Sequence, residues 1–144
     1  MLIIVVVVLA AIFIFQTSQP QFAGEKQLKE WQAAMRADTV GGQTAEETLQ
    51  MFLAALRAGD VELASRFFLL DEEGNRERWT KELNEAKKLG RTEKIVAFLS
   101  TAVPAVEEIT SEGDFKFKFN DEGNTGFLDM ELNTYSGVWK IESF

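Results

Sequence analysis

The side chains that could do chemistry in this sequence are few. Tyr135 is the single tyrosine, and Asp129 and Glu131 are carboxylates at alternate positions of one predicted strand. A buried carboxyl group has a raised pKa and can act as a general base. However, Tyr135 stands beside a predicted turn, and no second catalytic group lies at a useful spacing from it. We therefore predict no catalytic residue, and we expect Asp129 and Glu131 to belong to a solvated sheet face.

The sequence contains neither histidine nor cysteine. Histidine is the commonest general base and pH switch, and cysteine supplies thiolate nucleophiles, disulfides and iron–sulfur ligands. Enzymes that depend on these side chains, such as serine proteases and zinc hydrolases, are therefore excluded. A lipoprotein anchor is excluded as well, because it is attached to a cysteine.

Two acidic loops resemble calcium-binding loops in composition. They are DEEGN at residues 71–75 and DEGN at residues 121–124. Neither has the alternating ligand positions and final glutamate of an EF-hand, and Asp, Asn and Gly are common turn residues. We expect turns here and no metal site. No cofactor is expected either, because the sequence lacks the glycine motifs that bind phosphate or dinucleotides.

Several large apolar side chains are candidates for lining a ligand pocket. Small-molecule sites are lined mainly by such side chains. A small domain also needs roughly this many of them to fill its core, so core packing is the competing interpretation. The candidates are Phe67, Phe117, Met130, Tyr135 and Trp139.

Helical spacing of apolar residues dominates the chain as far as Pro104. Thr44 and Glu47 form a capping box that begins a helix, and Gly59 ends it. Further helices are predicted over residues 61–69, capped by Asp60, over residues 76–89, and over residues 93–101, capped by Thr92.

After Pro104 the pattern changes to alternation. Phe115, Phe117 and Phe119 alternate with lysines, which is typical of a strand with one buried face. Helices followed by an antiparallel meander predict an α+β fold, with the helices packed on a sheet of about four strands. The other strands are predicted over residues 105–110, 126–134 and 138–144.

Two stretches resemble a known family. TAEETLQMFLAALRAGDVELASRFF (residues 44–68) is similar to the opening of NTF2-like domains of the DUF4878 or cystatin-like-fold type. GVWKIESF (residues 137–144) is similar to their last strand. The resemblance implies that residues 44–144 form a cone, in which a curved antiparallel sheet wraps around the first long helix. It also implies export and tethering to the bacterial cell envelope. The chain departs from the family by placing two helices in residues 76–101.

Residues 1–15 (MLIIVVVVLAAIFIF) are apolar throughout. A helix that is apolar on every face belongs in lipid. Fifteen helical residues span about 22 Å, and continuing to residue 19 reaches the headgroups on the far side. We interpret residues 1–19 as a transmembrane anchor. The alternative is a cleaved signal peptide, but no basic residue precedes the apolar run and a good cleavage site is missing.

Residues 20–43 are predicted to link the anchor to the domain. They contain a short amphipathic helix over residues 25–37 and a flexible break over residues 38–43 (DTVGGQ). We expect Trp31 to pack on the domain rather than to lie at the membrane interface. The lysines of this linker favour a cytoplasmic domain, whereas the family resemblance favours an extracytoplasmic one, which we adopt.

The chain carries 15 Lys and Arg against 23 Asp and Glu, a net charge of −8. Such a surface repels nucleic acid and anionic lipid, so membrane contact must come from residues 1–19. The predicted function is a membrane-tethered, non-enzymatic binding or structural domain of the cell envelope with a protein partner. The alternatives are an NTF2-like enzyme or small-ligand carrier and, more remotely, a pilin-like subunit, which usually carries Glu where this chain has Val5.

Overall fold

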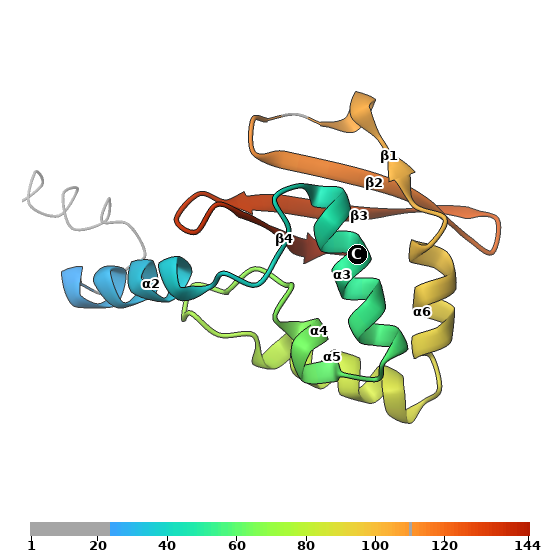
Figure 1. The fold of residues 1–144 in the computed structure, drawn as a ribbon, viewed down its shortest axis with the longest axis horizontal. Coiled ribbons are helices and arrows are strands. Elements are labelled where there is room, and N and C mark those ends of the chain that lie inside the picture. Colours follow the sequence, from blue (N-terminus) through green and yellow to red (C-terminus); the bar gives the residue numbers. More distant parts are fainter. Residues whose placement is uncertain (1–23, 110) are drawn as a thin grey trace, which may run out of the picture. The chain divides into compact units, whose positions relative to one another are not determined.

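The computed structural model describes residues 24–109 and 111–144. In this part of the chain five helices precede a four-stranded antiparallel sheet, so the α+β class is confirmed (Figure 1). The helices are α2 (Glu25–Ala37), α3 (Ala45–Arg57), α4 (Val61–Ser65), α5 (Glu77–Lys88) and α6 (Thr92–Leu99). The strands are β1 (Val103–Pro104), β2 (Asp114–Asp121), β3 (Asn124–Asn133) and β4 (Val138–Ser143), which are neighbours in this order.

The proposed anchor, residues 1–19, lies outside the described residues and stays a prediction. Among residues 24–109 and 111–144, none of the helices combines the length and the apolar character that crossing a bilayer requires.

Helix α3 forms where the capping box predicts it. Thr44 Oγ1 accepts a hydrogen bond from the Glu47 N–H at 3.1 Å, and the Glu47 carboxylate accepts one from the Gln43 N–H at 2.8 Å. Amide groups at the start of a helix have no partner within it, so both bonds stabilise this end. Gly59 follows the helix with a φ of 70°, a conformation that favours glycine.

Strands β2 and β3 form a hairpin closed by Glu122 and Gly123, which both have positive φ, as a two-residue turn of this twist requires. Phe117 pairs with Leu128, and both side chains are buried on the face that the helices cover. On the other face, Lys116 forms an ion pair with its cross-strand neighbour Asp129 at 2.8 Å. The alternation in the sequence therefore predicted this hairpin correctly.

The core lies between the sheet and helices α3 and α6, which pack on the same face of the sheet (Figure 1). Trp79 of α5 closes the core at one side, where its ring stacks on that of Phe68 at a centroid distance of 4.0 Å. The largest fully buried apolar side chains are Phe52, Phe67, Phe68, Phe117, Leu53, Leu99, Leu128, Met130 and Ile141.

Helix α4 is shorter than the predicted helix over residues 61–69. The chain leaves the helix after Ser65 because the following residues pair with the outer edge of β4. Ile141 N–H donates to Phe67 O, and Leu69 N–H donates to Ile141 O, both at 2.8 Å. Leu63 of this helix is exposed.

Two further local predictions are wrong. In the strand predicted over residues 105–110, the described residues 105–109 do not form a strand, because the pairing of β1 with β2 ends at Pro104 and residues 106–108 turn into a short 3-10 helix. Thr92 does not cap α6 but is its first residue, and the preceding Arg91 makes no capping bond through its side chain.

Candidate functional site

Residues 38–42, which we call the strap, lie against β4. The Trp139 N–H donates to Gly42 O at 3.0 Å. Thr48 Oγ1 accepts from the Gly42 N–H at 2.8 Å and donates to Trp139 O at 3.0 Å. A Cβ atom on Gly41 would lie 2.5 Å from Trp139 O, so glycine is needed for this close approach. The segment expected to be a flexible break is thus bonded to the last strand of the domain.

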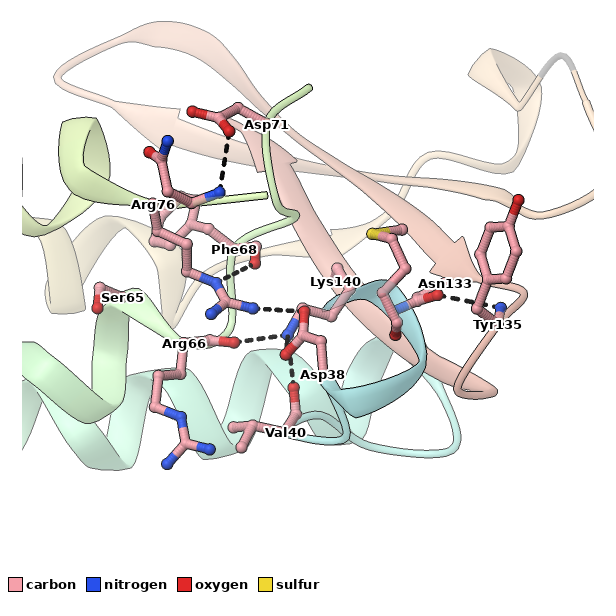
Figure 2. A network of polar contacts seen from close by, with 12 residues as sticks. Asp38, Val40, Ser65, Arg66, Phe68, Asp71, Arg76, Asn133, Tyr135 and Lys140 are labelled. Carbon is pink, nitrogen blue, oxygen red and sulfur yellow. Dashed lines mark hydrogen bonds and ion pairs between the residues drawn. The ribbon is translucent and has the colours of Figure 1, made fainter. Parts of the chain in front are cut away.

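Lys140 of β4 is completely buried beneath the strap (Figure 2). Its ammonium group donates to Asp38 Oδ1 at 2.9 Å, to Val40 O at 2.8 Å and to Arg66 O at 2.5 Å. An ammonium group has three protons, so each donor has an acceptor. This satisfies the general requirement that a buried charge be paired and hydrogen-bonded.

Asp38 is shared between two cations. While Oδ1 accepts from Lys140, Oδ2 forms an ion pair with Nη2 of Arg76, and only 5% of the Asp38 side chain is exposed. Arg76 is oriented by a second bond, from Nε to Phe68 O at 2.9 Å. We call Asp38, Arg76 and Lys140 the ionic cluster. It brings together three separate parts of the chain and carries two positive charges against one negative charge.

Burial lowers the pKa of Lys140 to about 8, because surroundings of low polarity disfavour the charged amine. The carboxylate of Asp38 opposes this shift. The guanidinium groups of Arg76 and Arg66 add to it, because like charges disfavour the protonated form.

Stability should depend on pH through this lysine. The folded-state pKa of about 8 lies below the ordinary value of 10.5, so between these values the folded state binds fewer protons than the unfolded state. The free energy of unfolding therefore rises with pH between the two pKa values. At lower pH Lys140 is protonated in both states, and its titration adds nothing to the free energy of unfolding. Relative to a Lys140→Met variant, the wild-type chain should gain about 2 kcal/mol between pH 7 and pH 10.

Urea denaturation of both proteins at several pH values in this range checks the prediction. Lys116 and Lys118, whose pKa values are raised by hydrogen bonds to carboxylates, titrate in both proteins and cancel in the comparison. Parallel pH profiles for the two proteins would contradict the prediction.

The loop between β3 and β4 is attached to α2. Asn133 Nδ2 donates to Met35 O at 2.9 Å, and Asn133 Oδ1 accepts from the Tyr135 N–H at 3.0 Å. The ring of Tyr135 meets that of Trp31 edge-on at a centroid distance of 5.6 Å. The Trp31 indole also donates to Asp71 O at 3.1 Å. Trp31 therefore packs on the domain, as expected.

A groove of about 800 Å³ lies between α4 and α5, beside the ionic cluster. Arg76 belongs to both, because its side chain also lines the groove. Most of the lining residues are polar or charged, with Arg66 and Lys81 as well as Glu62 and Glu77, and Val61 and Leu70 add apolar surface. This arrangement suits hydrogen bonding to a polar partner at an open surface.

The sequence-predicted pocket residues divide into two groups. Phe67, Phe117 and Met130 belong to the core cluster and are at most 2% exposed. Trp139 is half-buried and packs against this cluster, whereas Tyr135 lies at the surface with 39% exposure. None of the five lines the groove between α4 and α5.

The two carboxylates considered for catalysis are partly exposed on the outer face of the sheet. Asp129 forms its ion pair with Lys116 there. Partial burial raises the pKa of Glu131, and the nearby carboxylates of Glu142 and Asp114 add to the shift. In the described residues neither Asp129 nor Glu131 makes a hydrogen bond with Tyr135, so the structure does not assemble the three groups.

Asp38, Arg76 and Lys140 were not predicted from the sequence to form a site. One signal was present, because Lys140 stands between Trp139 and Ile141 in a strand with little other charge.

Comparison of the chain with protein-family models, curated proteins and solved structures gives no significant match.

Proposed function

We propose that this chain is a membrane-tethered, non-enzymatic binding domain of the cell envelope. The observation that carries the proposal is the filled interior. Phe67, Phe117 and Met130, which would line the pocket of a small-ligand carrier or enzyme, are packed in the core with at most 2% exposure. A domain with a filled interior is left with its outer surface for recognition.

We infer that the partner contacts the groove between α4 and α5. Its support is the combination of an open groove, lined mostly by polar and charged residues, with a side chain that is already oriented. Arg76 is fixed by Phe68 O and by Asp38, so little conformational entropy is lost when a partner binds beside it. Arginine is one of the residue types, with tryptophan and tyrosine, that often contribute most to binding at interfaces.

The tether is supported by the sequence, and the NTF2-like arrangement is supported by the sequence together with the order of the helices and strands. Residues 1–15 are apolar throughout, which favours insertion into lipid. The long helix α3, the Gly59–Asp60 step and the short helix α4 follow the order that the resemblance implies, and α3 packs on an antiparallel sheet. An extracytoplasmic domain follows from the same resemblance.

Membrane fractionation tests the tether. The wild-type chain should remain in the membrane pellet after alkaline extraction, whereas a Val7→Arg, Leu9→Arg double variant should become soluble, because each arginine costs about 3 kcal/mol at the centre of a helix in lipid. Leu89→Arg is the matched control, since Leu89 is 63% exposed on the domain, and it should stay in the pellet. A soluble wild-type chain of full length would refute the proposal. Protease added outside intact cells should digest the domain.

Photocrosslinking tests the binding face. A photoreactive amino acid at Lys81, in the groove, should form a crosslink with an envelope protein, whereas the same residue at the exposed Glu112 should not. The crosslink from Lys81 should weaken in an Arg66→Gln background. Equal crosslinking from both positions, or none from Lys81, would remove the groove from the proposal.

A further inference from the structure

Hydrogen bonds hold residues 31–42 on the domain, together with the edge-on contact between Trp31 and Tyr135 and the burial of Met35. These residues, which we call the arm, comprise the second half of α2 and the strap. They are attached by the hydrogen bonds from Lys140 to Asp38 and to Val40 O (Figure 2). Further hydrogen bonds run from Asn133 to Met35 O and from Trp139 to Gly42 O. Polar contacts of this kind can be exchanged for contacts with water when a segment opens.

The arm contributes little to the apolar core. The core cluster of the described residues contains no member of the arm, and Val40 packs only at its margin. Met35 is buried but lies outside that cluster. Segments with few buried apolar contacts open at a lower free energy than the core of the same domain.

Asp38 holds the arm closed by an electrostatic contact. With the arm in place, its carboxylate pairs with Lys140 on one oxygen and with Arg76 on the other. Both cations belong to the domain rather than to the arm. Without this carboxylate they would face each other in a buried site, where unpaired charges are strongly disfavoured. When the arm is open, water can reach and hydrate both groups.

We propose that the arm detaches from β4 as a unit while the rest of the domain stays folded, and that Asp38 is the latch that closes it. In its biological role this device rests on the proposed tether. Twelve extended residues span roughly 40 Å at most. Opening of the arm would therefore increase the distance that the domain can reach from its anchor.

Thiol labelling tests whether the arm opens separately. The chain has no cysteine, so single cysteines can be introduced at Met35 in the arm and at Ala55 in α3, which are 5% and 4% exposed. In the full chain in detergent, Met35→Cys should react with a maleimide at least about 100 times faster than Ala55→Cys, with a weaker dependence on urea. Equal rates with equal urea dependence would show that the arm opens only when the domain unfolds, and would overturn the proposal.

A second substitution tests the latch. Asp38→Asn should accelerate labelling of Met35→Cys by about 100-fold, because it removes the charge that pairs with two cations. Asp129→Asn is the matched control, since its ion pair with Lys116 is partly exposed, and it should change the rate less than threefold. No acceleration by Asp38→Asn would overturn the assignment of the latch.

The possibility that Asp38→Asn unfolds the whole domain is tested with Ala55→Cys in the same background. If Ala55→Cys then reacts as fast as Met35→Cys, the arm is not a separate unit and the proposal fails. Labelling rates depend neither on lipid insertion nor on a partner. Failure of the arm would therefore leave the fractionation and crosslinking results unchanged, and failure of the tether would leave the labelling ratio unchanged.

Discussion

Replacing Asp38 by alanine is expected to lower the free energy of unfolding by about 3–5 kcal/mol. The substitution leaves the completely buried ammonium group of Lys140 and the half-buried guanidinium group of Arg76 without their shared carboxylate. Uncompensated buried charges are costly because the protein interior solvates them poorly. Urea denaturation followed by far-UV circular dichroism measures the change.

The matched control for this prediction is Asp129→Ala. Asp129 also forms an ion pair with a lysine, at 2.8 Å, but both side chains are 31% exposed. The control should cost about 1 kcal/mol or less. Combining Asp38→Ala with Lys140→Met should cost at least about 1 kcal/mol less than the sum of the two single effects, because the double variant removes both partners. Similar losses for Asp38→Ala and Asp129→Ala would refute the buried pairing.

Phe68→Ala is expected to destabilise the domain by a similar amount, about 3–5 kcal/mol. The Phe68 side chain is completely buried. It stacks on Trp79 and meets the Phe52 ring edge-on at a centroid distance of 5.5 Å. Truncation would leave a cavity where two further aromatic side chains lose contact, and the surrounding structure can fill such a cavity only in part.

The exposed Phe127 provides the control for this substitution. It is 38% exposed on the outer sheet face, and Phe127→Ala should cost less than about 1 kcal/mol. Phe68→Leu should fall between the two, because leucine fills part of the space. Guanidinium denaturation of the three variants checks the order, and a Phe68→Ala effect as small as that of Phe127→Ala would show that the aromatic cluster is not tightly packed.

The prediction for Asp38 separates two roles of the ionic cluster. If the cluster only supports the fold, Asp38→Ala and Phe68→Ala should both accelerate labelling of the arm and of the core to the same extent. If Asp38 is also a latch, its loss should leave labelling at position 35 faster than labelling at position 55, whereas Phe68→Ala should bring the two rates closer together. The two large predictions are therefore most informative when they are measured on the same set of variants.

Where local chemistry decides the structure, the sequence predicted it well. Thr44 and Glu47 satisfy the first amide groups of α3, and Gly59 ends this helix, each within a few residues of its partner. The alternation of Phe115, Phe117 and Phe119 with lysines defined β2 because side chains on a strand point to opposite faces at every step. Such signals lie within a short window and do not depend on distant residues.

The prediction of helix 61–69 failed for the opposite reason. Residues 66–69 have helical spacing, but Phe68 lies beside Ile141, and hydrogen bonds to β4 replace those of another helical turn. Propensity is a weak preference that a long-range pairing can override. Nothing within residues 61–69 indicates that the partner is a strand more than seventy positions away.

What the sequence by itself determined is the class of the fold, the start and end of α3, the central hairpin and the lack of histidine and cysteine chemistry. Only the tertiary structure decided that Lys140 is buried and that Asp38, 102 positions away, pairs with it. Alternation along β4 puts Lys140 on the face opposite Trp139 and Ile141, where a lysine ordinarily meets water. The strap covers that position, and a buried ammonium group needs acceptors, which the folded chain supplies from three segments that share no local pattern.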